Sequence, residues 1–313
     1  MSIDVSIIIC TYNRAESLKD TLNSINQLDI DAYQVELLVV DNNSSDNTKD
    51  IVLNFSQQSK FPTRYLFESQ QGLSYARNRG IKESQGQIIL FTDDDVLPAS
   101  SWLIKMKRSM DSYHCLACGG YIAPIWEGDK PKWLTERFYG YLAVKIETRG
   151  PFRIEKNEEL PFGANMGFRR EAFDKYGLFD TNRGRKGSNL ASGEDGEFFQ
   201  RMIDAGEHIY YFPDSHVQHK VESFRLKKNY FRRWRYQSSK NIAQAVGIQG
   251  DRLLFGIPLY MYPQLFRSVV KAIKSKLLDT PDEALHREML VCHFLGTMSG
   301  LYQKEFHGTP RKE

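Results

Sequence analysis

The central feature of the sequence is the segment Gln87-Ile88-Ile89-Leu90-Phe91-Thr92-Asp93-Asp94-Asp95-Val96, an apolar run that ends in three consecutive acids. Its β-branched residues, bounded by Gly86 and Pro98, predict a short buried strand. In open α/β sheets, ligands bind at the carboxyl ends of such strands. Because adjacent carboxylates repel one another, ligation of a hard divalent cation or acceptance of hydrogen bonds from sugar hydroxyls explains them better than a structural role. For the triplet taken alone, a solvated turn with a helix N-cap stays an alternative.

Length and composition indicate a globular chain. Its 313 residues suffice for one large α/β domain with an appended module, or for two domains. A hydrophobic content of 41% and an aromatic content of 12% provide a substantial core and argue against disorder. The formal net charge of +3 is mild, so charge does not indicate a nucleic-acid partner. No signal peptide or membrane span is predicted, and we expect a cytoplasmic protein, soluble or peripheral on the cytoplasmic face of a membrane.

The cysteines give little functional information. Cys10 lies in an apolar strand pattern, which is typical of a small buried hydrophobe. Cys115 and Cys118 form one C-x-x-C pair next to His114, but no second pair follows at a spacing suited to zinc. The sequence therefore favours a reduced compartment and leaves the role of this pair open.

Upstream of the acid triplet, the sequence predicts a first buried strand from Asp4 to Cys10. It leads through Thr11-Tyr12-Asn13-Arg14 into a helical pattern. A polar loop between a parallel strand and a helix N-terminus is a natural place for a nucleotide. A helix cap from Thr11 or Asn13 together with a solvated Arg14 is the structural alternative.

A second strand, Val35 to Val40, ends at Asp41. Asp46 or Ser45 can cap the helix that follows, which leaves Asp41 without a capping role. An acid at this strand tip can accept hydrogen bonds from a base or a ribose.

A third strand, Arg64 to Phe67, precedes a helix that carries Arg77 and Arg79. Both arginines are candidates for binding a pyrophosphate, and one of them is expected on a solvated helix face. The repeated strand–helix pattern predicts a doubly wound parallel sheet. The sequence has no G-x-G-x-x-G after the first strand and no G-x-x-x-x-G-K-[ST], which disfavours a nicotinamide enzyme and a P-loop ATPase.

Together, four segments resemble family 2 glycosyltransferases: Ile7–Arg14, Val39–Asp46, Gly72–Gly80 and Thr92–Val96. The resemblance implies a GT-A fold with a helical C-terminal extension, and an inverting enzyme that uses a nucleotide-diphosphate sugar. By this resemblance, Thr11 and Asp41 would contact the base of the donor and Arg77 its diphosphate. Asp93 would contact the ribose or the donor sugar, and Asp95, the last acid of a D-x-D motif, would ligate Mn²⁺ or Mg²⁺. The expected donor-binding set is completed by Asn13, Arg14 and Asp94.

The resemblance continues on the acceptor side. Gly163 would let the backbone approach a ligand closely, and Asn165 would hydrogen-bond a sugar hydroxyl of the acceptor. A polar, basic stretch from Thr181 to Gly193 is typical of a mobile loop that could close on the donor. The aromatic-rich segment from Pro124 to Arg153 matches no motif, and its rings are expected to pack rather than to stack on sugars.

Glu194 and Asp195 open a further helix, where acids are also favoured by the helix dipole. By the resemblance, Asp195 is the catalytic base that takes the proton from the acceptor hydroxyl, with Glu194 in support. A histidine that completes the metal site is expected after the strand at Tyr210 to Pro213. His219 fits that place better than His216.

We therefore predict a GT-A catalytic domain over residues 1–222, with a nucleotide-sugar half to about 123 and an acceptor half over 124–222. A basic, aromatic helical subdomain would follow over 223–313. Its apolar stretches with interspersed lysines fit either an interfacial membrane segment or an ordinary packed subdomain. The basic–aromatic pattern could also suggest RNA, but the acidic site and the mild net charge argue against a nucleic-acid partner.

The predicted function is transfer of a sugar from a nucleotide-diphosphate sugar, with a UDP-sugar as the preferred donor, to a hydroxyl of a glycan or lipid-linked acceptor. Such a reaction would serve the synthesis of cell-surface polysaccharides or glycoconjugates. A metal-dependent nucleotidyltransferase also needs paired acids, but it would usually show a glycine-rich basic loop after the first strand. A non-catalytic carbohydrate-binding protein is the third hypothesis, and the two acidic motifs disfavour it.

Overall fold

The computed structural model describes residues 2–31, 33–155, 160–185, 193–247 and 252–307. Its internal contacts divide the chain into two compact units. Unit 1 is built from the described residues within 1–125, 143–188 and 192–220, and unit 2 from those within 126–142 and 221–313. The sequence-based division assigned residues 126–142 to the acceptor half, whereas the structure groups them with the C-terminal helices.

Unit 1 begins with alternating strands and helices, as the sequence predicts. The elements of its first part are β1 (Val5–Thr11), α1 (Ala15–Ile25), β2 (Val35–Asp41), α2 (Thr48–Ser56), β3 (Thr63–Phe67), α3 (Leu73–Glu83), β4 (Ile88–Asp93), β5 (Val96–Pro98) and α4 (Trp102–Ser112). β1 lies between β2 and β4 and pairs in parallel with both, and β2 pairs in parallel with β3. The parallel α/β centre is confirmed.

The second part of unit 1 extends this sheet with antiparallel strands. Its elements are β6 (Ala117–Trp126), β7 (Phe152–Arg153), the 3-10 turn η3 (Gly163–Asn165), β8 (Met166–Arg169), α5 (Arg170–Tyr176), α6 (Glu194–Asp204) and β9 (Ile209–Val221). In the described residues the strand order is β3-β2-β1-β4-β8-β6-β9-β5, with β7 beside β9. The sequence indicated only a short strand near Tyr210, but β9 continues for 13 residues.

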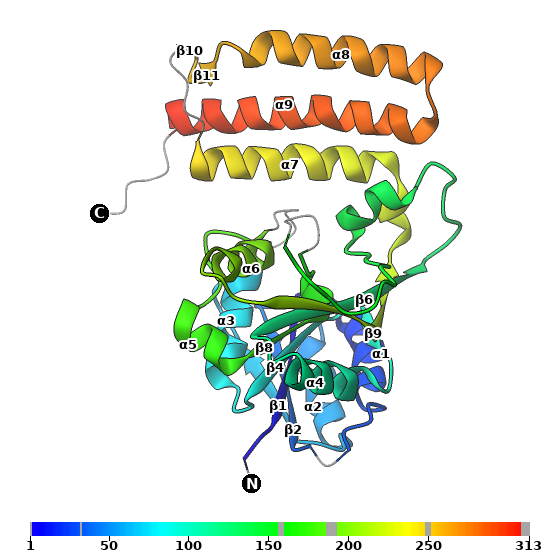
Figure 1. Cartoon of the computed structure of the whole chain (residues 1–313), viewed down its shortest axis with the longest axis vertical. Helices are drawn as coiled ribbons and strands as arrows, with labels where there is room; N and C mark the ends of the chain where they lie inside the picture. Colours follow the sequence, from blue (N-terminus) through cyan, green and yellow to red (C-terminus); the bar gives the residue numbers. More distant parts are fainter. Residues whose placement is uncertain (1, 32, 156–159, 186–192, 248–251, 308–313) are drawn as a thin grey trace. The chain divides into compact units, whose positions relative to one another are not determined.

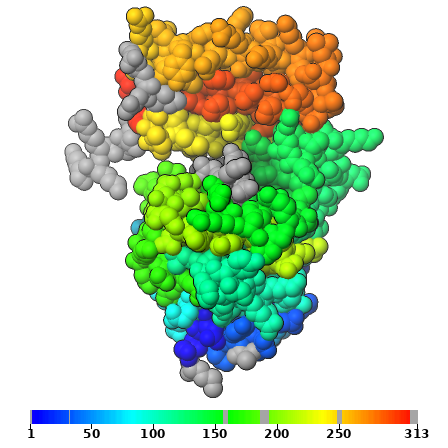
Figure 2. Space-filling view, viewed as in Figure 1, coloured from blue at the N-terminus to red at the C-terminus, as the bar shows by residue number. Residues whose placement is uncertain are grey.

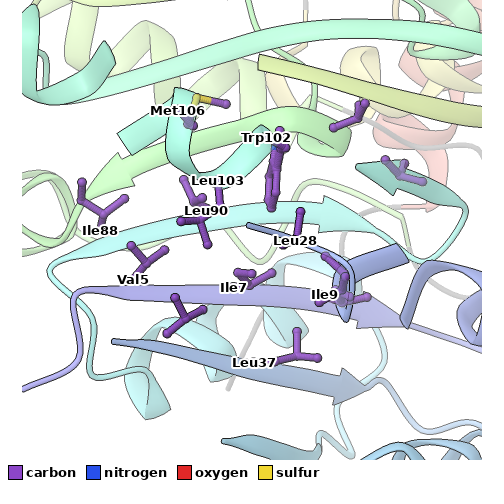
Figure 3. Close-up of a cluster of buried hydrophobic side chains, with 14 of the residues drawn as sticks. Val5, Ile7, Ile9, Leu28, Leu37, Ile88, Leu90, Trp102, Leu103 and Met106 are labelled. Atoms are coloured by element: carbon purple, nitrogen blue, oxygen red, sulfur yellow. The ribbon is translucent and has the colours of Figure 1, made fainter. Parts of the chain in front are cut away.

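Helices cover both faces of the sheet because the central strands are apolar on both sides. Ile7 and Ile9 point to one face, where α1, α2 and α4 pack, and Ile8 points to the other, where α3, α5 and α6 pack. Figure 3 shows Val5, Ile7 and Ile9 along β1 beside Leu90 of β4, with the side chains of α4 over them. The hydrophobic core on each face of the sheet holds the central strands in place, and with them the polar residues at the strand ends.

Unit 2 is helical. It contains η1 (Glu136–Leu142), η4 (Ser223–Leu226), α7 (Lys228–Val246), a short hairpin of β10 (Leu253–Leu254) and β11 (Ile257–Pro258), α8 (Met261–Leu278) and α9 (Pro281–His307). α9 packs against both α7 and α8 (Figure 1). None of the described helices combines the length and the hydropathy that a membrane span requires.

The aromatic side chains of residues 126–142 pack within unit 2. Phe231 of α7 makes edge-to-face contacts with Trp133, Phe138 and Tyr141, and Trp234 makes one with Tyr141. Such contacts stabilise a core beyond the area that they bury. The expectation that these rings pack is confirmed.

Candidate active site

Polar side chains converge where the parallel strands end. In the strand register, Thr11 at the end of β1 lies opposite Asp41 at the end of β2, and Cys10 lies opposite Asp93 at the end of β4. Parallel pairing therefore brings three separate sequence segments to one edge of the sheet. This is the edge at which α/β folds bind ligands.

The loop after β1 is hydrogen-bonded to the loop after β2. Asn13, which has a positive φ of 52°, accepts a hydrogen bond through Oδ1 from the Ser45 amide (2.7 Å), and its own amide donates to Ser44 Oγ (2.9 Å). Asp46 accepts from the amide of Ala15 at the start of α1 and from that of Thr48 at the start of α2, although the N-cap position of α2 is Asn47 and not the predicted Asp46 or Ser45. The predicted cap of the first helix by Thr11 or Asn13 is not formed, because Asn13 is used between the loops.

Asp41 is held in a fixed orientation. Tyr65 donates its hydroxyl to Oδ2 (2.7 Å) and the Ser44 amide donates to Oδ1 (2.9 Å). Burial and the hydrogen bond to Asp41 raise the pKa of Tyr65, so this phenol remains a donor at neutral pH. The sequence interpretation did not identify Tyr65 as a site residue. It lies on the predicted third strand, which pairs with the strand that ends at Asp41, and this position could have identified it.

Within the acid triplet, the three carboxylates have different environments. Asp93 is 36% exposed, whereas the side chains of Asp94 and Asp95 are buried. Thr11 donates to Asp94 Oδ2 (2.7 Å), and Arg14 approaches Asp94 (3.5 Å) and Asp95 (3.1 Å). Burial raises the pKa of Asp94 to about 7, against the lowering effect of Arg14. Asp94 is thus engaged by the protein itself, and Arg14 is an ion-pairing residue rather than a solvated one.

His219 reaches the triplet through the sheet. Antiparallel pairing of β5 with β9 places His219 opposite Val96, the residue after Asp95. Its Nε2 lies 3.3 Å from Asp95 Oδ2, and both side chains are buried. His216 on the same strand is exposed and stacks on Tyr121. Strand alternation therefore explains why His219, and not His216, faces the acids.

Arg77 is buried between two acids. Its guanidinium contacts Glu194 (2.7 Å) and lies 4.0 Å from Asp93, and it packs over the Phe179 ring. Only 3% of Arg77 is exposed. Its charge is thus paired inside the protein, and the contact with a donor diphosphate stays a prediction. Arg79 is the solvated arginine, 44% exposed and paired with Glu83.

Glu194 and Asp195 begin α6 beside this pair. Burial and the neighbouring Asp195 raise the pKa of Glu194, whereas Arg77 lowers it. Glu194 Oε2 is buried and has no hydrogen-bond partner among the residues that the structure describes. Asp195 accepts from the amide of Gly163 through Oδ2 (3.0 Å) and from that of Gly196 through Oδ1 (2.8 Å). Two backbone donors thus fix the orientation of Asp195.

The two residues predicted on the acceptor side are both in close contact with other protein groups. A Cβ at Gly163 would lie 2.0 Å from the Arg77 guanidinium, so this glycine makes room for Arg77, and the approach of a ligand to its backbone stays a prediction. Asn165 is fully buried, and its amide bonds to the Trp102 indole and to the carbonyls of Tyr121 and Ser215. Because these bonds use both donors of the amide, Asn165 joins strands and cannot donate to an acceptor sugar.

Two further predictions concern the cysteine pair and the basic loop. Cys115 and Cys118 are fully buried free thiols in the core, and the described residues contain no cluster of three or more His, Cys, Asp or Glu suited to a metal. Of the predicted loop over 181–193, residues 186–192 lie outside the described residues. Its beginning contacts α3, where Ser74 Oγ donates to the Arg183 carbonyl (3.0 Å).

Fold and site together define an α/β enzyme with an acidic ligand site at the carboxyl edge of a parallel sheet. Residues 6–177 match the family model described as Glycosyl transferase family 2. This match covers more than half of the chain, which therefore belongs to glycosyltransferase family 2 and is a glycosyltransferase.

Two relatives come from Haloferax volcanii. The chain is 26% identical over 239 residues to a glucosyl-dolichyl phosphate glucuronosyltransferase, with 71% of each protein covered. It is 29% identical over 230 residues to the glycosyltransferase AglE, with 73% of this chain and 71% of the relative covered. A succinoglycan biosynthesis protein, ExoM of Rhizobium meliloti, is 24% identical over 76% of this chain and 74% of its own length.

Solved structures show the same GT-A fold. The mannosyltransferase PcManGT from Pyrobaculum calidifontis, in complex with GDP-Man and Mn²⁺, superposes with a TM-score of 0.60 at 17% identity. That match covers 99% of this chain and 89% of the other. S. aureus TarS 1-349, in complex with UDP, gives a TM-score of 0.55 at 16% identity, covering 99% and 93%.

Proposed function

We propose that this glycosyltransferase is inverting and metal-dependent, and that it moves a sugar from a UDP-sugar to a hydroxyl of a glycan or lipid-linked acceptor. The observation that carries the proposal is the position of Arg77 between Asp93 and Glu194. This bridge places the start of α6, with Asp195, next to the acids at the strand ends. A donor site and a proton acceptor are thereby brought together.

Asp95 and His219 are the proposed metal-binding residues. Their Oδ2 and Nε2 atoms face each other as an oxygen and nitrogen donor pair, in which the carboxylate is the ligand type that suits Mn²⁺ or Mg²⁺. Two protein ligands suffice when water and substrate phosphates supply the others. When bound, the metal would neutralise the charge that builds on the leaving diphosphate.

Asp195 is the proposed base. Its carboxylate, held by the Gly163 and Gly196 amides, would accept the proton of the acceptor hydroxyl as that oxygen attacks the anomeric carbon. Attack by one oxygen from the face opposite the leaving diphosphate is a single displacement. Such a displacement inverts the anomeric configuration.

Donor and acceptor classes follow from the site and the relatives. Asp41, fixed by Tyr65, is the proposed acceptor of hydrogen bonds from the base, and the exposed Asp93 that of the ribose or sugar hydroxyls. Among the comparison proteins, one structure holds UDP and another GDP-Man, and one relative is named for a dolichyl phosphate substrate. These names support a nucleotide-sugar donor and a lipid-linked acceptor for this chain.

A panel of UDP- and GDP-sugars together with UTP, incubated with the protein in Mn²⁺ and then in EDTA, tests the proposal. We expect slow release of free UDP from one UDP-sugar, and its loss in EDTA. Release of pyrophosphate from UTP would instead support a nucleotidyltransferase. Donor binding without any turnover, in the presence of a lipid-phosphate acceptor series, would support a binding protein. Release of GDP alone would overturn the choice of UDP.

A further inference from the structure

α8 buries one side in unit 2 and exposes an apolar stripe on the other. Phe266, Ile273 and Leu277 are 70%, 59% and 80% exposed, and their spacing of seven and four residues places them on one side of the helix. Met261 and Ala272, on the opposite side, are buried. In the space-filling view α8 lies at the outer edge of the unit 2 helices, beside α9 (Figure 2).

The β10–β11 hairpin exposes further apolar side chains near the beginning of α8. Leu253, Leu254 and Phe255 are each between 44% and 60% exposed. The hairpin is tied to the beginning of α8, because the Tyr262 hydroxyl donates to the Leu254 carbonyl (2.9 Å). Large apolar side chains exposed in number on neighbouring elements suggest an interaction site.

The charges that α8 itself carries are all positive. α8, which is described throughout, contains no Asp or Glu. Its four basic residues are all exposed: Arg267, Lys271, Lys274 and Lys276. At 100° per residue, Arg267 and Lys274 lie on one side of the stripe and Lys276 on the other. An apolar stripe with basic flanks is the pattern of helices that lie in a membrane interface.

We propose that α8 and the β10–β11 hairpin form a surface that binds anionic lipid membranes. The apolar side chains would enter the boundary between headgroups and acyl chains, and the basic side chains would contact lipid phosphates. A second copy of this chain is a poorer occupant, since stripe-to-stripe packing would bring eight cations together without a compensating acid on α8. The inference is independent of the proposed sugar transfer.

Flotation with vesicles tests it on the full-length protein. Vesicles of phosphatidylcholine with 30% phosphatidylglycerol are compared with pure phosphatidylcholine, at low and at 0.5 M salt. We expect binding to the anionic vesicles that salt weakens. The variant F266S/I273S/L277S should bind at least tenfold more weakly, and K271Q/K274Q/K276Q roughly fivefold more weakly for each lysine removed.

The control variant is I242S/V246S, which removes exposed apolar side chains of α7 (57% and 69% exposed) and should bind like the parent. Circular dichroism melting of each variant establishes that it is folded. Equal flotation of the stripe variant and the parent overturns the proposal, and so does the absence of parent binding at low salt. Self-association of the parent that the stripe variant abolishes, without vesicle binding, would assign the surface to a second copy.

Discussion

Two acidic clusters in unit 1 are neutralised by arginines in different environments. Arg14, which pairs with Asp94 and Asp95, has 26% of its side chain exposed. Arg77, which pairs with Glu194, has 3% exposed and is wedged against Gly163. Arg14 reaches solvent, so another cation can replace it beside the buried Asp94 and Asp95, whereas Arg77 is enclosed and cannot leave without stranding a buried charge.

By this difference in exposure, Arg14 is an exchangeable cation and Arg77 is a permanent one. We infer that Arg14 can give way when a metal binds Asp95, so that the cluster at the strand ends changes its partner during a reaction. Arg77 instead fixes the position of α6, and with it Asp195. The experiments below test the roles of Asp195, Arg77 and the strand-end acids in this comparison, in order of decreasing expected effect.

Asp195→Asn should reduce sugar transfer by about 10³-fold or more, because it removes the proton acceptor. Donor affinity, measured by thermal shift or calorimetry, should change little, since the side chain keeps its volume. The matched control is Asp204→Asn on the exposed side of the same helix, which should remain active. Donor binding that weakens as much as transfer would show that Asp195 belongs to the donor site.

Arg77→Met should lower the free energy of unfolding by about 3–5 kcal/mol, because it leaves Glu194 buried and unpaired. The double variant R77M/E194Q should recover part of this loss, since the unpaired charge is gone. Denaturant titration measures both. The control Arg79→Met, at a solvated position of the same helix, should cost under 1 kcal/mol. If both single variants are equally stable, Arg77 has no fixed structural role.

His219→Ala should weaken Mn²⁺ binding by roughly 10- to 100-fold or more, the range seen when groups that support a metal are removed. The readout is the Mn²⁺-dependent rise of the melting temperature in the presence of UDP. His216→Ala, three residues earlier on the exposed side of β9, is the matched control. An unchanged response in the His219 variant would exclude it as a metal ligand.

The reactivity of the Cys10 thiol reports on the electrostatic environment next to Arg77 and the strand-end acids. Burial raises the pKa of its thiol to about 12, with Arg77 acting in the opposite direction. A raised pKa keeps the protonated thiol at pH 8, and only the thiolate reacts with iodoacetamide. We expect alkylation of Cys10 in the native chain to be at least about tenfold slower than in the urea-unfolded chain, as peptide mass mapping would show. Equal rates would contradict the raised pKa, since Cys10 is only partly buried.

Much of the parallel centre could be predicted because each strand is coded locally. The apolar run before Asp93 and the one before Asp41 each specify a buried strand and its polar end. The length of β9 could not be predicted, because its alternating exposed and buried residues are held as a strand by pairing with β5 and β7, which are distant in the sequence. The place of residues 126–142 in unit 2 depends likewise on contacts with α7.

Some site residues could be predicted from the sequence and others could not, because their roles depend on contacts between distant segments. His219 was preferred over His216 by its order in the chain, and the structure adds strand alternation as the physical cause. Arg77, Gly163 and Asn165 were each assigned to a ligand, but the structure uses all three internally. A sequence shows which groups can bind a phosphate or a sugar, but not which are already occupied by the protein.

The sequence alone therefore determined the order of strands and helices and the acids that follow the strands, because these depend on local patterns of apolar and polar residues. Tertiary structure alone decided which acid meets which cation. Arg14 and Asp95, or Arg77 and Glu194, are far apart in the chain, and only the packing of the sheet and α6 determines their distance and their exposure to water.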